Sequence, residues 1–138
     1  MKAAVNDGSK PRDLEDRTFL FAQSVRAFVK ELPRTLANTK DVRQLVRASG
    51  SVAANWIEAE ESRSKKDFLL PAKICRKEAK ESRLFLRLLE TGADKTAARD
   101  IVAGEARELT LIFSAIVGKA TVNLSQTGVW SLLGAWVL

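Results

Sequence analysis

The chain has 138 residues, enough for one domain with its own core, and its 46% hydrophobic and 29% charged residues are an ordinary globular balance. Seven glycines and three prolines are too few for the many turns of a β-sandwich, and the helix formers Ala, Leu, Arg, Lys and Glu dominate. A net charge of +6 and a pI near 9.8 favour polyanionic partners, RNA or DNA first. A charge that only keeps the protein in solution fits these values equally well.

Three features of the sequence bear on the cellular compartment. Cys75 is the only cysteine, so the chain cannot form a disulfide within itself and a reducing compartment is allowed. The opening MKAAVNDGSKPRD lacks the apolar centre of a signal peptide. No segment approaches the roughly 20 apolar residues of a membrane span. We therefore expect a cytoplasmic protein with no membrane partner.

The first predicted helix follows a flexible lead, residues 1–12, which Pro11 closes. Apolar residues at steps of three, four and seven then mark one face of a helix: Leu14, Phe21, Val25, Phe28 and Leu32. Pro33 ends this helix, because proline lacks an amide donor and restricts the residue before it.

A second helix is predicted to begin at Asn38, whose side chain can cap free amides, with Asp41 suited to the positive end of the helix. Its apolar stripe runs through Gly50 without a break and consists of Val42, Leu45, Ser49, Val52 and Trp56.

A third helix is predicted to follow SKKD at 64–67, which resembles a capping box. It should run to about Thr91 and end at Gly92, the usual residue for a left-handed stop. Pro71 lies beyond the first turn of this helix, so we expect a local kink there.

Asp94 is predicted to cap a fourth helix, with an inner face of Val102, Leu109, Ile112 and Ile116. Four helices with short connections predict an all-α, antiparallel up-down-up-down four-helix bundle over residues 13–120. The 3-4 spacing suits the shallow crossing angles of such a bundle. Residues 121–138 are predicted to form a tail, polar at first and apolar at its end.

Small residues on the second and third helices predict that these two helices approach closely. The second helix offers Ser49, Ser51, Ala53 and Ala54, and the third offers Ala72, Cys75, Ala79 and Ser82. Cys75 fits this face as a small hydrophobe rather than as a reactive thiol. Polar side chains beside the contact are predicted to bond across it as a polar clasp that fixes the register: Asn55, Glu58, Glu81 and Ser82.

The residue types present argue against most catalytic and metal sites. Glu58 and Glu61, or Glu78 and Glu81, have the i, i+3 spacing of a di-metal bundle, but the chain has no histidine to complete the Glu-x-x-His motif. The absence of histidine also argues against zinc and against Ser-His or Cys-His catalysis. We expect no catalytic residue, metal or cofactor; acid–base chemistry by paired carboxylates is the remaining enzymatic alternative.

Five basic residues form the predicted nucleic-acid-binding face: Lys40, Arg43, Arg47, Lys65 and Lys66. The first three lie about one turn apart on the outer side of the second helix, and the other two begin the third. A solvated, salt-bridged surface is an equally good interpretation. No aromatic residue interleaves with these charges, so bases would have no visible stacking platform.

Two stretches, QLVRASGSVAANWIEAEESRSKKDF and KEAKESRLFLRLLE, resemble the family of four helix bundle proteins, which includes proteins encoded in intervening sequences of bacterial 23S ribosomal RNA genes. The resemblance covers roughly residues 13–120. Its most telling positions are Gln44, Arg47, Ser49, Asn55, Glu58, Ser64, Asp67, Phe68, Glu78, Ala79, Glu81 and Ser82. Pro71 departs from the family pattern, and the tail lies outside it.

The resemblance implies a left-handed antiparallel bundle, rings of five subunits, and neither enzymatic activity nor a cofactor. Related proteins accompany reverse transcriptases in diversity-generating retroelements, where a basic pentamer engages nucleic acid and the polymerase. These implications give two expectations: a self-assembling bundle that associates with RNA, or a protein-interaction adaptor such as a reverse-transcriptase accessory subunit.

The apolar end of the tail adds an argument for assembly from the residues themselves. It is too short to span a bilayer and would leave a sticky patch in water. We therefore predict a homo-oligomer in which the tail contributes an oligomer contact through Trp130, Leu133 and Trp136. The number five comes only from the resemblance.

Overall fold

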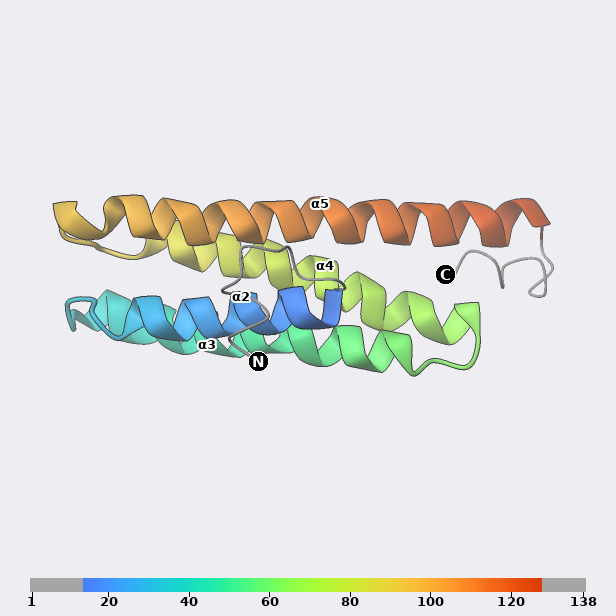
Figure 1. Ribbon diagram of the computed structural model, residues 1–138, viewed down its shortest axis with the longest axis horizontal. Helices are drawn as coiled ribbons and strands as arrows, with labels where there is room; N and C mark the ends of the chain where they lie inside the picture. Colours follow the sequence, from blue (N-terminus) through green and yellow to red (C-terminus); the bar gives the residue numbers. More distant parts are fainter. Residues whose placement is uncertain (1–13, 128–138) are drawn as a thin grey trace.

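A computed structural model describes residues 14–127, with side chains described as far as residue 122. Within this range the chain forms α2 (Leu14–Val29), α3 (Leu36–Glu60), α4 (Lys65–Leu88), the short 3-10 helix η1 (Ala93–Lys95) and α5 (Thr96–Thr127). Consecutive helices run in opposite directions and lie side by side, and α5 also contacts α2 (Figure 1). The predicted all-α antiparallel four-helix bundle is confirmed. The predicted lead and the apolar end of the tail lie outside the described residues.

The core largely follows the stripes that the sequence predicts on α2 and α3. On α5 only Leu109 of the predicted inner face is fully buried, whereas Val102, Ile112 and Ile116 are partly buried. The fully buried side of α5 consists of Ala106, Leu109, Phe113 and Ala120. Phe21, Val25, Leu45, Val52 and Leu109 are at most 2% exposed and belong to one apolar cluster that all four helices share. Burial of apolar side chains is the main favourable term in folding, so these stripes hold the four helices together.

Trp56 connects this cluster to a smaller one at the end of the bundle where α3 ends and α4 begins. Its ring centroid lies 5.6 Å from that of Phe113 and 5.9 Å from that of Phe68. These centroid separations are typical of packed aromatic pairs, so the indole continues the core toward that end.

The start of α3 differs from the prediction. Thr35, not Asn38, caps the helix: the Thr35 hydroxyl accepts a hydrogen bond from the Asn38 amide at 3.1 Å. The Asn38 side chain is instead buried, donating to the Pro33 carbonyl (3.0 Å) and the Glu90 carbonyl (2.8 Å) and accepting from the Glu90 amide (2.8 Å). Asn38 thus joins the α2–α3 connection to the end of α4.

The third predicted helix is confirmed at its start and corrected at its end. Ser64 caps α4 by accepting from the Asp67 amide at 3.1 Å, and the helix continues through Pro71. It ends at Leu88, before the predicted stop. Gly92 has a φ of −69° and is therefore not a left-handed C-terminal residue; it precedes η1 instead.

The last helix begins later and runs further than predicted. Asp94 lies within η1 rather than at the cap, and α5 begins at Thr96. It continues to Thr127, past the predicted boundary at residue 121. No glycine or proline interrupts residues 119–127, so the polar composition there did not end the helix.

Candidate nucleic-acid interface

The predicted polar clasp is wrong in three of its four members. The Asn55 amide donates to the carbonyl and the hydroxyl of Ser51 on its own helix, each at 3.0 Å, and Glu58 is exposed. Glu58 follows the buried Val52 by six residues, about 120° around the helix, so it cannot share the buried face.

A different set of polar groups joins α3 to α4. Arg47 of α3 donates to the Glu78 carboxylate at 3.4 Å and to the Glu81 carboxylate at 3.3 Å. Glu81 therefore bonds across the contact as predicted, but its partner is Arg47. Ser82 is fully buried and donates to the Glu78 carbonyl of its own helix at 2.8 Å. Arg47 is consequently neutralised by carboxylates within the fold.

The close approach of small residues is confirmed on α4 and corrected on α3. The α4 members are all fully buried: Ala72, Cys75, Ala79 and Ser82. On α3, Ser49 is fully buried with Ala48, whereas Ser51 and Ala53 are partly exposed and Ala54 is exposed. The Cys75 thiol donates to the Val52 carbonyl at 3.4 Å, and burial raises its pKa to about 12. This thiol stays protonated and suits packing rather than nucleophilic chemistry.

The five predicted basic residues do not form one surface. Lys65 is 1% exposed, and burial, followed by the nearby positive charge of Lys119, lowers its pKa. Lys40 lies near the start of α3 and Lys66 at the start of α4, at opposite ends of the bundle (Figure 1). Arg43 is exposed on α3. With Arg47 held by two carboxylates, the predicted face is wrong as a single site.

The positive charge of the protein is concentrated on α4. This helix contains eight lysines and arginines against three aspartates and glutamates, a net charge of +5, whereas the whole chain has a net charge of +6. A field from one helix surface attracts polyanions more effectively than the same charge spread evenly.

Six of these cations form a continuous row along α4, which we call the basic stripe: Lys66, Lys73, Arg76, Lys80, Arg83 and Arg87. Their spacing of seven, three, four, three and four residues keeps them on one side of the helix. Lys66 and Arg87 are 21 positions apart, or about 31 Å at 1.5 Å per residue. Within the described part of the chain, none of the six forms a salt bridge, whereas their neighbour Lys77 pairs with Glu78 at 3.7 Å.

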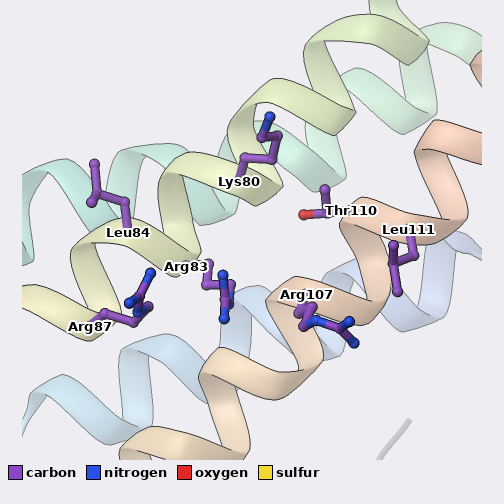
Figure 2. Close-up of a pocket in the computed structure, with 7 residues that line it drawn as sticks. All are labelled: Lys80, Arg83, Leu84, Arg87, Arg107, Thr110 and Leu111. Atoms are coloured by element: carbon purple, nitrogen blue, oxygen red, sulfur yellow. The ribbon is translucent and has the colours of Figure 1, made fainter.

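The C-terminal half of the basic stripe borders a groove between α4 and α5 (Figure 2). Its lining consists of Lys80, Arg83, Leu84, Arg87, Arg107, Thr110 and Leu111. Arg83 lies between the two helices, and Arg107 lies across from it on α5 (Figure 2). The groove has a volume of about 170 Å³, below the range of about 300–1,000 Å³ that is usual for small-molecule pockets. Its size suits a phosphate group of a longer chain rather than an enclosed ligand.

The arrangement in the groove favours an external anion. Like charges three or four residues apart on a helix destabilise it by roughly 0.2–0.5 kcal/mol per pair, and Arg83 has such neighbours at both Lys80 and Arg87. Arginine presents paired N–H donors that match the oxygens of a phosphate. A phosphate chain along the stripe would relieve the repulsion and satisfy these donors.

The row of cations is visible in the sequence as a 3-4 spacing, but its significance is not. Lys77 and Arg47 look equally available in the sequence, and only the fold pairs them with carboxylates. The 3-4 spacing of lysines and arginines from Lys66 to Arg87 is the sequence signal from which this row could have been predicted.

Other chemistry has little support among the described residues. They contain no group of three or more His, Cys, Asp or Glu side chains placed to hold a metal ion. None of their helices combines the length and the apolar character needed to cross a bilayer.

Comparison with known proteins supports the fold. No protein-family model and no curated protein matches the chain. A crystal structure of a protein of unknown function from the S23 ribosomal protein family of Bacteroides thetaiotaomicron VPI-5482 is similar, with a TM-score of 0.62 and 24% sequence identity. The match covers 76% of this chain and 98% of the other. At 24% identity this similarity shows a shared four-helix fold, and no function is inferred from it.

Proposed function

We propose that the protein binds the phosphate backbone of RNA through the basic stripe of α4. The observation that carries this proposal is the unbroken row of six cations without a carboxylate partner among the described residues. Arg107 extends the row across the groove at its C-terminal half. The mode of binding is electrostatic and independent of base sequence, because phosphate contacts carry no sequence information.

Two further observations support this proposal. The resemblance to proteins encoded within ribosomal RNA genes favours RNA over other polyanions. The similar solved protein is named for a ribosomal protein family, although its own function is unknown. The alternative, a charge that serves only solubility, does not require the cations to be aligned.

Salt-dependent affinity for a fluorescently labelled RNA oligonucleotide tests the proposal. The variant Arg83→Gln/Arg87→Gln removes two charges from the basic stripe. We expect weaker binding at every salt concentration and a slope of log affinity against log salt that is smaller by about 1.4–1.8, from 0.7–0.9 per lost contact.

The matched control is Lys40→Gln/Arg43→Gln, which removes two exposed charges from α3 and leaves the stripe intact. Among the described residues, these two members of the sequence-predicted face on α3 form no salt bridge, whereas Arg47 does. Equal losses in the two variants would mean that net charge alone governs binding. No binding by the unmodified protein at low salt would remove the proposal.

The adaptor interpretation is the second candidate, and the exposed apolar surface of α5 favours it. Leu111 is 50% exposed and Ile101 is 74% exposed on that helix. A protein partner such as a reverse transcriptase would bind with weak salt dependence, which separates this candidate from RNA binding. The absence of enzymatic activity stays a prediction.

The ring of five also stays a prediction, drawn from the resemblance. Light scattering on the full chain gives the number of subunits directly. Because α5 continues to Thr127, a truncation that tests the tail belongs after that residue rather than after Thr121. A monomer at micromolar concentration would contradict assembly, and an unchanged oligomer after truncation would remove the tail from the contact.

A further inference from the structure

The basic stripe lies on the outer surface of one continuous helix rather than inside a cleft. Four of its six cations are exposed, and the other two, Arg76 and Arg83, are half-buried. From Lys73 onward, neighbouring cations are three or four residues apart, which is about 4.5–6 Å along the helix axis. Because the helix is packed against the rest of the bundle, these cations form a line of charge with a fixed spacing.

The surface around the stripe offers bases no aromatic side chain to stack on. Of the two aromatic residues of α4, Phe68 is buried and Phe85 packs against the core. Within residues 14–122 the one exposed aromatic ring is that of Phe19 on α2, a helix that packs against α3 and α5. Proteins that hold single strands combine a basic groove with aromatic rings on which successive bases stack. The stripe supplies only the charge.

The uncharged polar side chains that bind base edges are also missing from α4. Its sequence contains no Asn, Gln, Thr or Tyr, and its one serine, Ser82, is fully buried. The groove beside the stripe has a volume of about 170 Å³, so it is too small for a whole nucleotide turned out of a strand. Arg83 and Arg107, which lie across from each other there, can bind a phosphate while the bases stay outside (Figure 2).

We propose that the basic stripe binds double-stranded RNA along the phosphates of a paired segment. This inference rests on the RNA binding proposed above and specifies the form of the RNA. A duplex pairs and stacks its own bases, so it requires neither an aromatic ring nor a base contact from the protein. Double-stranded RNA is accordingly recognised mostly by its shape and by contacts to phosphates and 2′-hydroxyls.

The length and the fixed spacing of the stripe favour the same partner. A double helix is stiff over lengths far greater than the stripe, so its phosphates are arranged before it binds. A single strand would have to be ordered along the stripe, which costs conformational entropy. A duplex also presents more charge, with about one phosphate per 1.7 Å of axis in B-form geometry against one per 3.4 Å for each strand.

Fluorescence anisotropy with two labelled RNAs tests the proposal. One RNA is a duplex of two complementary strands that is longer than the stripe, and the other is an unpaired oligouridylate with the same total number of phosphates. Each phosphate contact contributes about 0.9 to the salt slope for a duplex and about 0.7 for a single strand, so slopes from six contacts differ by about 1.2. If the two RNAs bind equally at about 1 M salt, we expect the duplex to bind at least about tenfold more tightly at about 0.1 M.

The form of the RNA and RNA binding itself fail in different ways. If neither RNA binds at low salt, RNA binding is removed altogether. If oligouridylate binds as tightly as the duplex or more tightly, the preference for duplex is overturned and RNA binding stands.

The variant Arg83→Gln/Arg87→Gln assigns the preference to the stripe. It should lower the duplex slope by about 1.8 and reduce the preference at about 0.1 M salt by two- to threefold. The control Lys40→Gln/Arg43→Gln should keep both values, and circular dichroism of the two variants checks that each is folded. A preference that is unchanged in the arginine variant would place duplex binding elsewhere and overturn the proposal.

The remaining aromatic candidates for base stacking are Trp130 and Trp136, which lie outside the described residues. A chain ending at Thr127 separates them from the stripe. If the stripe binds the duplex, the shortened chain keeps the preference for duplex over oligouridylate. A preference that is lost with residues 128–138 would assign it to that segment and overturn the proposal.

Discussion

The outer surfaces of α4 and α5 differ sharply although the two helices lie side by side in one bundle. Eleven of the 24 residues of α4 are charged, against six of the 32 residues of α5. Their inner sides are alike, since both bury alanines and large apolar residues in a common core. The fold accounts for the inner sides only.

The comparison teaches where function is to be sought in a simple bundle. Core packing needs one apolar stripe per helix, and both helices supply it. The row of cations on α4 and the exposed apolar residues Ile101, Leu111 and Val122 on α5 lie outside these stripes. Neither set is needed to form the core of the bundle. A polyanion suits the first and an apolar protein surface suits the second.

The largest effect should come from the inner side of α5. Phe113 is fully buried and contacts the Trp56 ring, so Phe113→Ala should lower the free energy of unfolding by about 3–5 kcal/mol. Leu111→Ala on the exposed side of α5 should change it by no more than about 0.5 kcal/mol in dilute solution. Urea unfolding of both variants measures the contrast. Similar losses would mean that the outer side also packs within one chain.

A smaller loss of stability is expected for Asn38 than for Phe113, and almost none for Asn55. The Asn38 side chain makes three hydrogen bonds and is 1% exposed, so Asn38→Leu should cost roughly 1–3 kcal/mol by leaving backbone groups of Glu90 unpaired. Asn55 bonds only within α3, and Asn55→Leu should be nearly neutral. Comparing the two urea midpoints checks this. A destabilised Asn55 variant with a stable Asn38 variant would restore the clasp that the sequence predicted.

A third effect is small and has the opposite sign. Without RNA and at low salt, Arg83→Gln/Arg87→Gln should raise stability by a few tenths of a kcal/mol, because it removes repulsion along α4. Added salt should shrink the difference by screening. Thermal unfolding at two salt concentrations measures it. A loss of stability would mean that these arginines have carboxylate partners in solution.

The smallest effect at neutral pH concerns the Cys75 thiol. Burial raises its pKa from 9.0 to about 12, so the unfolded chain loses this proton first. The thiol therefore favours unfolding as the pH rises from about 9 toward 12, and below pH 9 it contributes no pH dependence. Alkylation by iodoacetamide should be slow in the folded protein across this window and fast in urea. Rapid alkylation of the folded protein near pH 9 would contradict the buried position.

The sequence predicts the fold well because the apolar stripes repeat over many turns. The stripe through Leu45 and Val52 remains readable even across Gly50. Helix ends were harder, because they depend on single contacts. Asn38 has the chemistry of a cap, yet its side chain binds Glu90, which is 52 residues away in the chain.

The site was predicted only in part for a related reason. The sequence shows which residues are charged but not which charges the fold neutralises. Arg47 and Lys66 look alike in the sequence, and only packing pairs Arg47 with Glu78 and Glu81. Lys65 lies next to Lys66, yet its side chain is on the buried side of α4.

The most direct test of the proposed RNA-binding surface is the salt-dependent RNA affinity of two variants side by side. Arg83→Gln/Arg87→Gln should lose affinity and reduce the salt slope by about 1.4–1.8. Lys40→Gln/Arg43→Gln should keep the slope of the unmodified protein, because it leaves the basic stripe intact. If the arginine variant binds RNA with the affinity and slope of the unmodified protein, the row of cations on α4 is not the RNA-binding surface.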